Sequence, residues 1–291
     1  MDSTRALARL ISRVEAGERV TGLAPGKARV VGLTGPPGVG KSTVTGALTA
    51  EFRAAGRRVA VLAVDPSSPF TGGALLGDRI RMQQHATDDG VFIRSMASRG
   101  QLGGLAAAAP QAVRVLDAAG FDVILIETVG VGQAEVEIAA QADTVIVLLA
   151  PGMGDAVQVA KAGILETADL FVVNKADKPD VERVVRDLRG LLALGSWERG
   201  WKPPVLTTVG ADGTGLAGVV EALDAHWEWL TGSDELNRRR LARARSEILA
   251  LAEGTLRSRL PKSALDELAT RVSDGSLDAF TAAEELLSSG A

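Results

Sequence analysis

The sequence contains no cysteine among its 291 residues, which excludes disulfide bonds, cysteine-ligated zinc and thiol catalysis. It also lacks any run that approaches the ~18 consecutive apolar residues of a membrane-spanning helix. The amino-terminal stretch alternates charged and apolar side chains without a continuous apolar block, unlike a secretory signal. We therefore expect a soluble, cytoplasmic protein.

An excess of positive charge is absent as well, because 32 lysines and arginines face 36 acidic residues and the net charge is −4. Attraction to nucleic acid or to an anionic membrane needs such an excess, so we expect neither as a partner. Lysine is scarce, with seven lysines among the 32 basic residues. Positions that keep lysine are therefore candidates for roles that need a compact ammonium rather than a planar guanidinium.

Strand-like and helix-like segments alternate through the first two thirds of the chain. The strand-like runs, such as "FDVILIET" and "DTVIVLLA", are continuously apolar, which is typical of strands covered by helices on both faces. This alternation predicts an α/β fold with a doubly wound, mostly parallel sheet. Ligands are expected at the carboxyl ends of the strands.

Helical segments flank the predicted sheet at both ends of the chain. Residues 1–25 are expected to form an N-terminal helical extension. Residues 232–291 show no strand pattern, and an arginine-rich amphipathic helix in this region ends at Pro261. Ser263 and Ser276 are the expected N-caps of two short helices that follow. Such a tail cannot bury its apolar stripes alone, so we expect it to pack on the sheet domain or on a second subunit.

A phosphate-binding loop is predicted where the first strand ends. The stretch "GPPGVGKS" matches G-x-x-x-x-G-K-[ST] between a predicted strand and a predicted helix, the context that supports this motif. Backbone N–H groups of the loop are expected to bind the phosphates. Lys41 is expected to reach the β- and γ-phosphates, and the Ser42 hydroxyl is expected to bind Mg²⁺. Pro36 makes the ATPases with two loop lysines a poorer match. The predicted nucleotide-binding residues here are Gly35, Gly38, Val39, Gly40, Lys41, Ser42 and Thr43.

The stretch "NKAD" predicts that the base is guanine. Asp177 can accept hydrogen bonds from guanine N1–H and N2–H₂, whereas adenine offers no donors there. Lys175 can lay its stem along the base, and Asn174 can tie this loop to the phosphate loop. "TTVGADGTG" stands where a second guanine loop belongs, with Val209 and Gly210 as its expected contacts. The G domain is accordingly assigned to residues 26–231.

Acidic residues at two strand ends are candidate magnesium and catalytic residues. In "ETVG", Glu127 replaces the aspartate of most GTPases but can still act near Mg²⁺, and the Gly130 N–H can sense the γ-phosphate. Gln133 is a candidate for orienting the attacking water. Asp65 opens "DPSSPFTGGALLGDRIRM", and it is expected beside Ser42 as a magnesium ligand, direct or through water. The alternative for Asp65 is an N-capping residue in a structural turn.

The glycines and charges that follow Asp65 suggest a segment that GTP and Mg²⁺ order and hydrolysis releases. Asp78 within it is expected to return toward the nucleotide. The candidate magnesium ligands are thus Ser42, Asp65 and Glu127. The candidate catalytic residues are Lys41, Asp65, Asp78, Glu127 and Gln133.

Six segments together resemble one protein family. They are "GPPGVGKST", "DPSSPFTGGALLGDRIRM", "SMASRGQLGGLA", "ETVGVGQAEVE", "PGMGDAVQVAKAGILETAD" and "NKAD". The chain looks like a member of the MeaB/ArgK/MMAA group, the GTPase chaperones of adenosylcobalamin-dependent acyl-CoA mutases such as methylmalonyl-CoA mutase. The resemblance runs from the N-terminal helix into the helical tail.

The resemblance implies a homodimer that binds the mutase and couples GTP hydrolysis to loading of intact cofactor and removal of damaged cofactor. It implies that residues 150–161 form a further switch facing the mutase, with Asp155, Gln158 and Lys161 as contacts. A solvated helix residue is the alternative for Lys161. Ala156 stands where the family tends to have an acidic residue, which bears on partner choice.

Cobalamin is expected to be held by the partner rather than by this chain. "DAHWEW" begins like D-x-H-x-x-G, but Trp229 replaces the glycine and His226 falls in a predicted helix. A cobalt-ligating histidine needs a strand-to-helix loop instead. A cobalamin adenosyltransferase is a second candidate partner.

The sequence thus predicts a P-loop GTPase that acts as a mutase chaperone and converts GTP and water to GDP and phosphate. A nickel-type metallochaperone GTPase of the same superclass is one alternative, although the absence of cysteine and the two scattered histidines argue against it. A substrate kinase of transport proteins is another, although no protein-kinase catalytic loop is present. A structural GTP-binding dimer is the third.

Overall fold

The structure is a computed structural model. It describes residues 4–24, 26–66, 85, 87–98, 104–128, 141–152, 167–195 and 200–289, with the backbone alone for 65–66, 97–98 and 104–107. Two compact units are present, residues 1–243 and residues 244–291. The first contains the predicted sheet.

A seven-stranded sheet in the order β3-β2-β4-β1-β5-β6-β7 forms the centre of the first unit, and every adjacent pair of strands is parallel. This confirms the predicted α/β fold. The strands are β1 (Arg29–Thr34), β2 (Val59–Pro66), β3 (Val91–Ser98), β4 (Val123–Thr128), β5 (Thr144–Leu149), β6 (Leu170–Val173) and β7 (Val205–Thr207).

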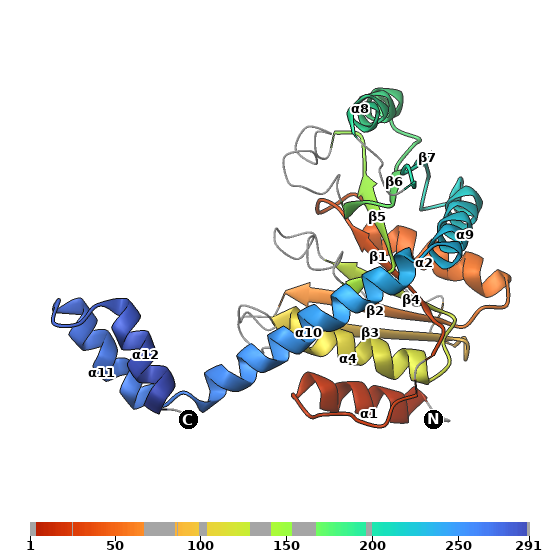
Figure 1. The fold of residues 1–291 in the computed structure, drawn as a ribbon. Helices are drawn as coiled ribbons and strands as arrows, with labels where there is room; N and C mark the ends of the chain where they lie inside the picture. The colour runs from red at the N-terminus through yellow and green to blue at the C-terminus, as the bar shows by residue number, and fades with distance from the viewer. Residues whose placement is uncertain are drawn as a thin grey trace. The chain divides into compact units, whose positions relative to one another are not determined.

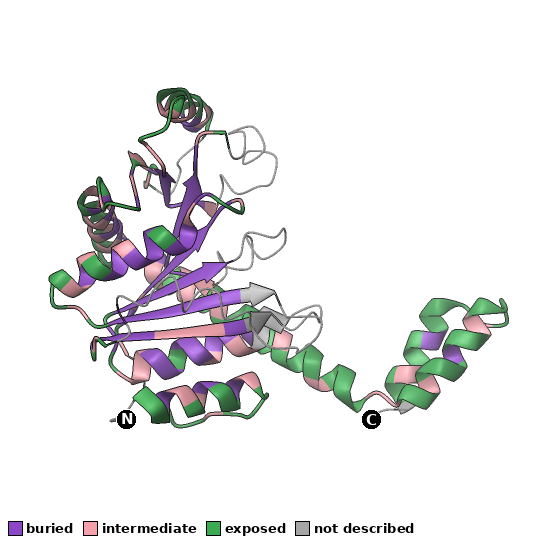
Figure 2. Cartoon of the chain, turned by 180° about the vertical axis from the view of Figure 1, so that it is seen from behind, coloured by how far each residue is buried: buried purple, intermediate pink, exposed green. Residues whose placement is uncertain are grey.

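Helices cover both faces of this sheet, which explains the continuously apolar strands (Figures 1 and 2). On one face, the core combines buried side chains of α1 (Thr4–Glu15), α4 (Gly104–Ala118) and α8 (Val181–Leu194). On the other face it combines those of α2 (Lys41–Ala54) and α9 (Leu216–Gly232). In α1 the predicted apolar face is buried through Leu7, Ile11 and Val14.

The order of the strands creates a switch point beside β1. The chain leaves β1 through α2, forms β2 and β3, and returns with β4 between β2 and β1, whereas β5 lies on the other side of β1. At such a point the connections that follow two neighbouring strands run in opposite directions. A crevice opens between them at the carboxyl ends of the strands, and ligands bind there. The phosphate loop follows β1.

The helical tail contains α10 (Glu235–Arg259), α11 (Lys262–Ser273) and α12 (Ala279–Ser289). The first turns of α10 belong to the sheet unit, and the remainder of α10 belongs to the second unit. In the second unit α11 and α12 form a helical hairpin, and an ion pair between Arg271 and Glu285 joins them at 2.9 Å. In the part of the chain that the structure describes, no helix is long and apolar enough to cross a membrane.

The predicted caps of the two short helices were wrong. Helix α11 begins at Lys262 with Pro261 as its N-cap, so Ser263 lies inside its first turn. Helix α12 is capped instead by Asp278, whose carboxylate accepts hydrogen bonds from the backbone N–H groups of Phe280 and Thr281, each at 3.0 Å. Aspartate and serine are equally good N-caps, and Asp278 directly precedes the helix, whereas Ser276 lies two residues farther from it.

Candidate functional site

Four strands deliver the sequence motifs to one edge of the sheet. Strand β1 runs into the loop 35–40, β4 ends just after Glu127, β6 ends directly before Asn174, and β7 ends directly before Thr208. Because the strands are parallel, their carboxyl ends share this edge. The phosphate-loop and N-K-x-D motifs are therefore brought together at the crevice where ligands bind in such sheets.

The loop 35–40 ends at the first turn of α2. Lys41 Nζ donates hydrogen bonds to the carbonyl oxygens of Gly35, at 2.7 Å, and Pro36, at 3.0 Å, so its ammonium lies against the loop. Gly40 has φ +97°, and a Cβ atom there would lie 2.4 Å from Asn174 Nδ2, so no larger residue fits. The positive end of α2 favours an anion at this loop.

Ser42 and Glu127 meet at the base of this loop. Ser42 Oγ donates a hydrogen bond to Glu127 Oε1 at 2.5 Å, and both side chains are buried. Glu127 is in place because β4 pairs with β1, with Leu33 and Glu127 in register. On the other side of β4, Ala63 is in register with Glu127, which places the backbone of Asp65 two residues farther along β2. The Asp65 side chain lies outside what the structure describes.

Asn174 joins three loops. Its Nδ2 donates to the carbonyl oxygen of Val39 at 2.8 Å, the tie to the phosphate loop that the sequence suggested. Its Oδ1 accepts from the Gly210 backbone N–H at 2.9 Å and from Thr208 Oγ1 at 3.2 Å. The approach is close, since a Cβ atom on Gly210 would lie 2.9 Å from Val44 Cγ2. A larger residue at position 210 would therefore crowd Val44.

Lys175 and Asp177 extend from the same loop toward solvent. Lys175 has φ +59°, a left-handed conformation that side chains other than glycine rarely adopt, and its Nζ donates to the Gly38 carbonyl oxygen at 2.8 Å. The Asp177 side chain is 48% exposed and lies 3.5 Å from Lys178 Nζ in a solvated ion pair. Strained backbone that presents an open carboxylate is typical of a ligand site. Val209 closes the neighbouring loop, its N–H donating to Thr214 O at 3.0 Å.

Several predicted residues lie outside the described part of the chain. They are Asp78, Gly130, Gln133, Asp155, Gln158 and Lys161. Among the described residues, no group of three or more His, Cys, Asp or Glu side chains is arranged to hold a metal ion. His226 is fully buried in α9, as expected for a core histidine, with its Nδ1 2.8 Å from Thr144 Oγ1.

The chain is similar to known GTPases over most of its length. The family model described as "Methylmalonyl Co-A mutase-associated GTPase MeaB" matches residues 10–264. The chain belongs to the MeaB family. The resemblance that the sequence segments indicated is therefore confirmed, and the chain is a P-loop GTPase that hydrolyses GTP.

Relatives of this MeaB-family chain come from all three domains of life. A protein of Pyrococcus abyssi is 48% identical over 97% of this chain and 92% of its own length. The GTPase ArgK of Escherichia coli is 41% identical over 72% of this chain and 64% of its own. The mitochondrial methylmalonic aciduria type A homolog of Caenorhabditis elegans is 37% identical over 72% of this chain and 54% of its own.

The fold is shared with a solved structure as well. The crystal structure of a LAO/AO transport system kinase aligns over 98% of both chains with a TM-score of 0.68 and 26% sequence identity. The fold of this MeaB-family chain is therefore also found in a solved structure.

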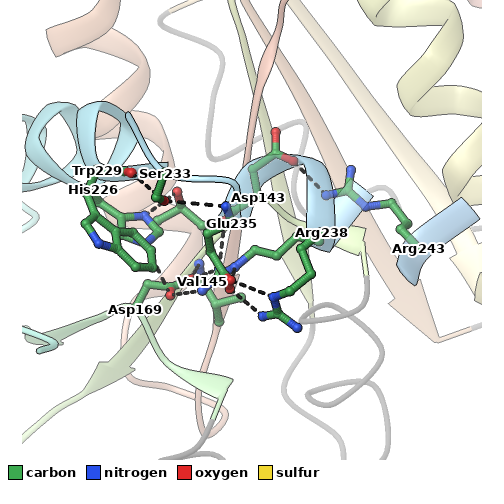
Figure 3. A network of polar contacts seen from close by, with 11 residues as sticks. Asp143, Val145, Asp169, His226, Trp229, Ser233, Glu235, Arg238 and Arg243 are labelled. Carbon is green, nitrogen blue, oxygen red and sulfur yellow. Dashed lines mark hydrogen bonds and ion pairs between the residues drawn. The ribbon is translucent and has the colours of Figure 1, made fainter. Parts of the chain in front are cut away.

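A second polar site was missed by the sequence reasoning. At the amino-terminal edge of the sheet, the start of α10 is joined to two buried aspartates, Asp143 before β5 and Asp169 before β6 (Figure 3). We call this set the α10 anchor. Its members are Asp143, Asp169, Glu235, Arg238, Arg239, Arg240 and Arg243. The run "RRR" at 238–240 was visible as an arginine-rich helix, but its partners lie about 70 to 100 residues away.

Ion pairs hold the carboxylates of the α10 anchor in the charged form. Burial alone would raise the pKa of Asp143, but Arg240 and Arg243 donate to it at 2.9 and 2.7 Å and hold that pKa below its usual range. Burial would likewise raise the pKa of Asp169, but hydrogen bonds and charge interactions with His226 and Arg239 outweigh burial and keep that pKa low. Hydrogen bonds from Arg238 lower the pKa of Glu235 to about 2, with a further contribution from Arg239.

Proposed function

We propose that this GTPase acts as a chaperone of an adenosylcobalamin-dependent acyl-CoA mutase, methylmalonyl-CoA mutase or a close relative. It would gate cofactor loading and protect or reactivate the mutase. The observation that carries this proposal is the match of the family described as mutase-associated over residues 10–264, which spans both nucleotide motifs and reaches into the tail. The 37% identity to the methylmalonic aciduria type A homolog supports it.

In this proposal the loop 35–43 holds the phosphates of GTP, and the loops after β6 and β7 hold the guanine. The exposed carboxylate of Asp177 accepts from guanine N1–H and N2–H₂, and Asn174 keeps the loops in place through its bonds to Val39 and Gly210. The Lys175 stem lies along the base. The backbone of Val209 and Gly210 completes the base site.

The residues at the loop base suit a magnesium ion. The Ser42 hydroxyl and the Glu127 carboxylate are hard oxygen donors only 2.5 Å apart, and Mg²⁺ prefers one or two such groups together with phosphate oxygens and waters. Ser42, Glu127 and Asp65 would hold it. When bound, the ion neutralises charge that develops on the phosphates during hydrolysis.

The protein's own part in hydrolysis is to position and stabilise. Lys41 and the amides of the loop stabilise negative charge on the β- and γ-phosphates, because they are fixed before the reaction begins. We assign Gln133 to orienting water, Gly130 to sensing the γ-phosphate and Asp78 to the nucleotide side of the segment after β2. We expect slow intrinsic turnover, with the partner ordering or completing the site.

Residues 150–161 are proposed as the switch that contacts the mutase, through Asp155, Gln158 and Lys161. Cobalamin stays on the partner, because His226 is buried inside α9 and does not face solvent. A homodimer and a cobalamin adenosyltransferase complete the proposed set of partners.

The test is GTP hydrolysis by the purified protein, alone and with a cobalamin-dependent mutase from the same source. We expect a clear rise in GTP turnover with the mutase, and co-elution of the two proteins in size-exclusion chromatography. ATP serves as the nucleotide control and heat-denatured mutase as the protein control. An unchanged rate without co-elution would leave the GTPase standing and overturn the chaperone role.

The name of the structural neighbour favours one second candidate, a kinase that phosphorylates a transport protein. This role predicts transfer of the labelled γ-phosphate to a protein rather than to water. Incubation with γ-labelled GTP or ATP and a transport protein from the same source separates the two. Label recovered as free phosphate alone would exclude the kinase role.

A further inference from the structure

Asp169 is held by several side-chain and backbone groups. Its Oδ1 accepts from Arg239 Nη2 at 2.8 Å, and its Oδ2 accepts from Arg239 Nη1 and from the Val145 backbone N–H, each also at 2.8 Å. His226 Nε2 lies 3.3 Å from Oδ1. The whole residue is only 4% exposed, so its position is fixed by these groups rather than by water.

Asp169 sits at the start of β6, and the guanine motif sits at its end. Strand β6 has four residues, Leu170–Val173, all buried, and Asn174 follows at once. The strand is bonded at both ends, by Asp169 N–H to Val145 O at 2.9 Å and by Asn174 N–H to Leu149 O at 2.8 Å. A four-residue strand spans about 13 Å and is stiff. A shift of Asp169 along the strand is therefore passed to Asn174.

The backbone of Asp169 also holds the segment that leads to the second guanine loop. Its carbonyl oxygen accepts from Trp201 Nε1 at 2.9 Å, and two residues farther Phe171 N–H donates to Pro204 O at 2.9 Å. Pro204 directly precedes β7, which ends at the loop that contains Gly210. The segment that leads into β7 is thus bonded to the backbone of Asp169 and of Phe171.

At the other end of β6, Asn174 tolerates little displacement. Asn174 makes three hydrogen bonds between 2.8 and 3.2 Å to two other loops. Glycine is required at position 40 because of its approach to Asn174. Small changes in the seat of β6 therefore alter how Asp177, three residues after Asn174, meets the base.

We propose that Asp169 and Arg239 are positioning residues for guanine recognition, which act through β6 from the opposite edge of the sheet. Because Arg239 belongs to α10, the start of the helical tail becomes part of the guanine site. This inference rests on the proposed role of Asp177, and it adds a determinant that no nucleotide motif contains.

The test measures the ratio of the dissociation constants for IDP and GDP. IDP lacks the 2-amino group, so the ratio reports on the contact with Asp177 and cancels the phosphate contacts. It also cancels a loss of folded protein, since both constants rise by the same factor when fewer molecules are competent. A purely structural role therefore leaves the ratio unchanged.

Matched variants come from adjacent residues of α10 and adjacent strands of the sheet. Arg239→Gln and Asp169→Asn break the pair at β6, whereas Arg240→Gln and Asp143→Asn break the corresponding pair at β5, in which the arginine is more exposed and the aspartate more buried. Arg239→Lys keeps the charge but loses the two-pronged contact. If Asp169→Asn does not fold, the two Arg239 variants carry the test.

We expect the ratio to fall about threefold or more in Arg239→Gln and Asp169→Asn, to fall less in Arg239→Lys, and to stay at the wild-type value in the β5 variants. An unchanged ratio in the β6 variants overturns the inference, and so does an equal fall in the β5 variants, because the route would then not be β6. A wild-type ratio near one would instead overturn the guanine role of Asp177, so the two failures are distinguishable.

Discussion

At the scale of single residues, our proposal assigns recognition of the base to Asp177. Its carboxylate matches two donors of guanine, whereas an amide matches the carbonyl that replaces the amino group in xanthine. We expect Asp177→Asn to weaken GDP binding about 100-fold or more and to create binding of xanthosine diphosphate. Lys178→Ala is the control, because the solvated Lys178–Asp177 pair contributes little. Isothermal titration with both nucleotides checks this, and unchanged GDP affinity in Asp177→Asn would locate base recognition elsewhere.

Gly40 provides a second residue-scale prediction. It combines φ +97° with contact to Asn174 Nδ2, so Gly40→Ala strains the backbone and pushes apart the phosphate and guanine loops. We expect GDP affinity to fall more than about tenfold. Gly190 in α8 has open space around it, so Gly190→Ala should raise the free energy of unfolding by about 0.5–1 kcal/mol without changing GDP affinity. Urea denaturation and nucleotide titration of both variants measure these effects, and normal GDP binding by Gly40→Ala would contradict the first.

At the scale of elements, the attachment of α10 to the sheet should depend on pH. The folded-state pKa of Glu235 is about 2 against an ordinary 4.5, and those of Asp143 and Asp169 are also lowered. A lowered pKa stabilises the fold above the unfolded-state value, and that stability is lost as the pH falls through the folded-state value. We therefore expect the free energy of unfolding to decrease between about pH 5 and pH 2.

Glu235→Gln isolates one part of this dependence. It should lower the free energy of unfolding by about 2 kcal/mol at pH 7 and leave a shallower decline toward pH 3. Glu18→Gln is the control, since the Arg13–Glu18 pair is more than half exposed and surface pairs contribute ~0–1 kcal/mol. Urea denaturation at a series of pH values measures both, and parallel curves for wild type and Glu235→Gln would refute the role of Glu235.

The elements also show which parts of the fold a sequence reveals. Strand–loop–helix motifs such as 35–42 and "NKAD" are local, and parallel strands then bring them to one edge without further information. The bond from Asn174 to Val39 was therefore foreseeable. The pair between Arg239 and Asp169 was not, because it joins residues 70 positions apart and has no periodic signature. Which arginines of α10 meet the sheet depends on packing that composition does not specify.

At the scale of the whole molecule, the boundary at residue 243 lies inside α10 rather than in a linker. The first turns of this helix complete the sheet unit, since they neutralise the two aspartates buried before β5 and β6. A chain that ends at Ser246 keeps all of these partners, whereas a chain that ends at Asp234 removes them. The two lengths differ by a single short piece of helix.

We expect the chain ending at Ser246 to unfold cooperatively and to bind GDP like the full chain. The free energy of unfolding of the chain ending at Asp234 should be lower by about 3–5 kcal/mol or more, because each buried aspartate is then left charged without its arginine partner. Urea denaturation followed by tryptophan fluorescence, with GDP titration alongside, compares the two. Equal stability of both chains would mean that the two aspartates remain buried without α10 at no cost in stability. The helical tail would then be an appendage of the GTPase rather than a part of its core.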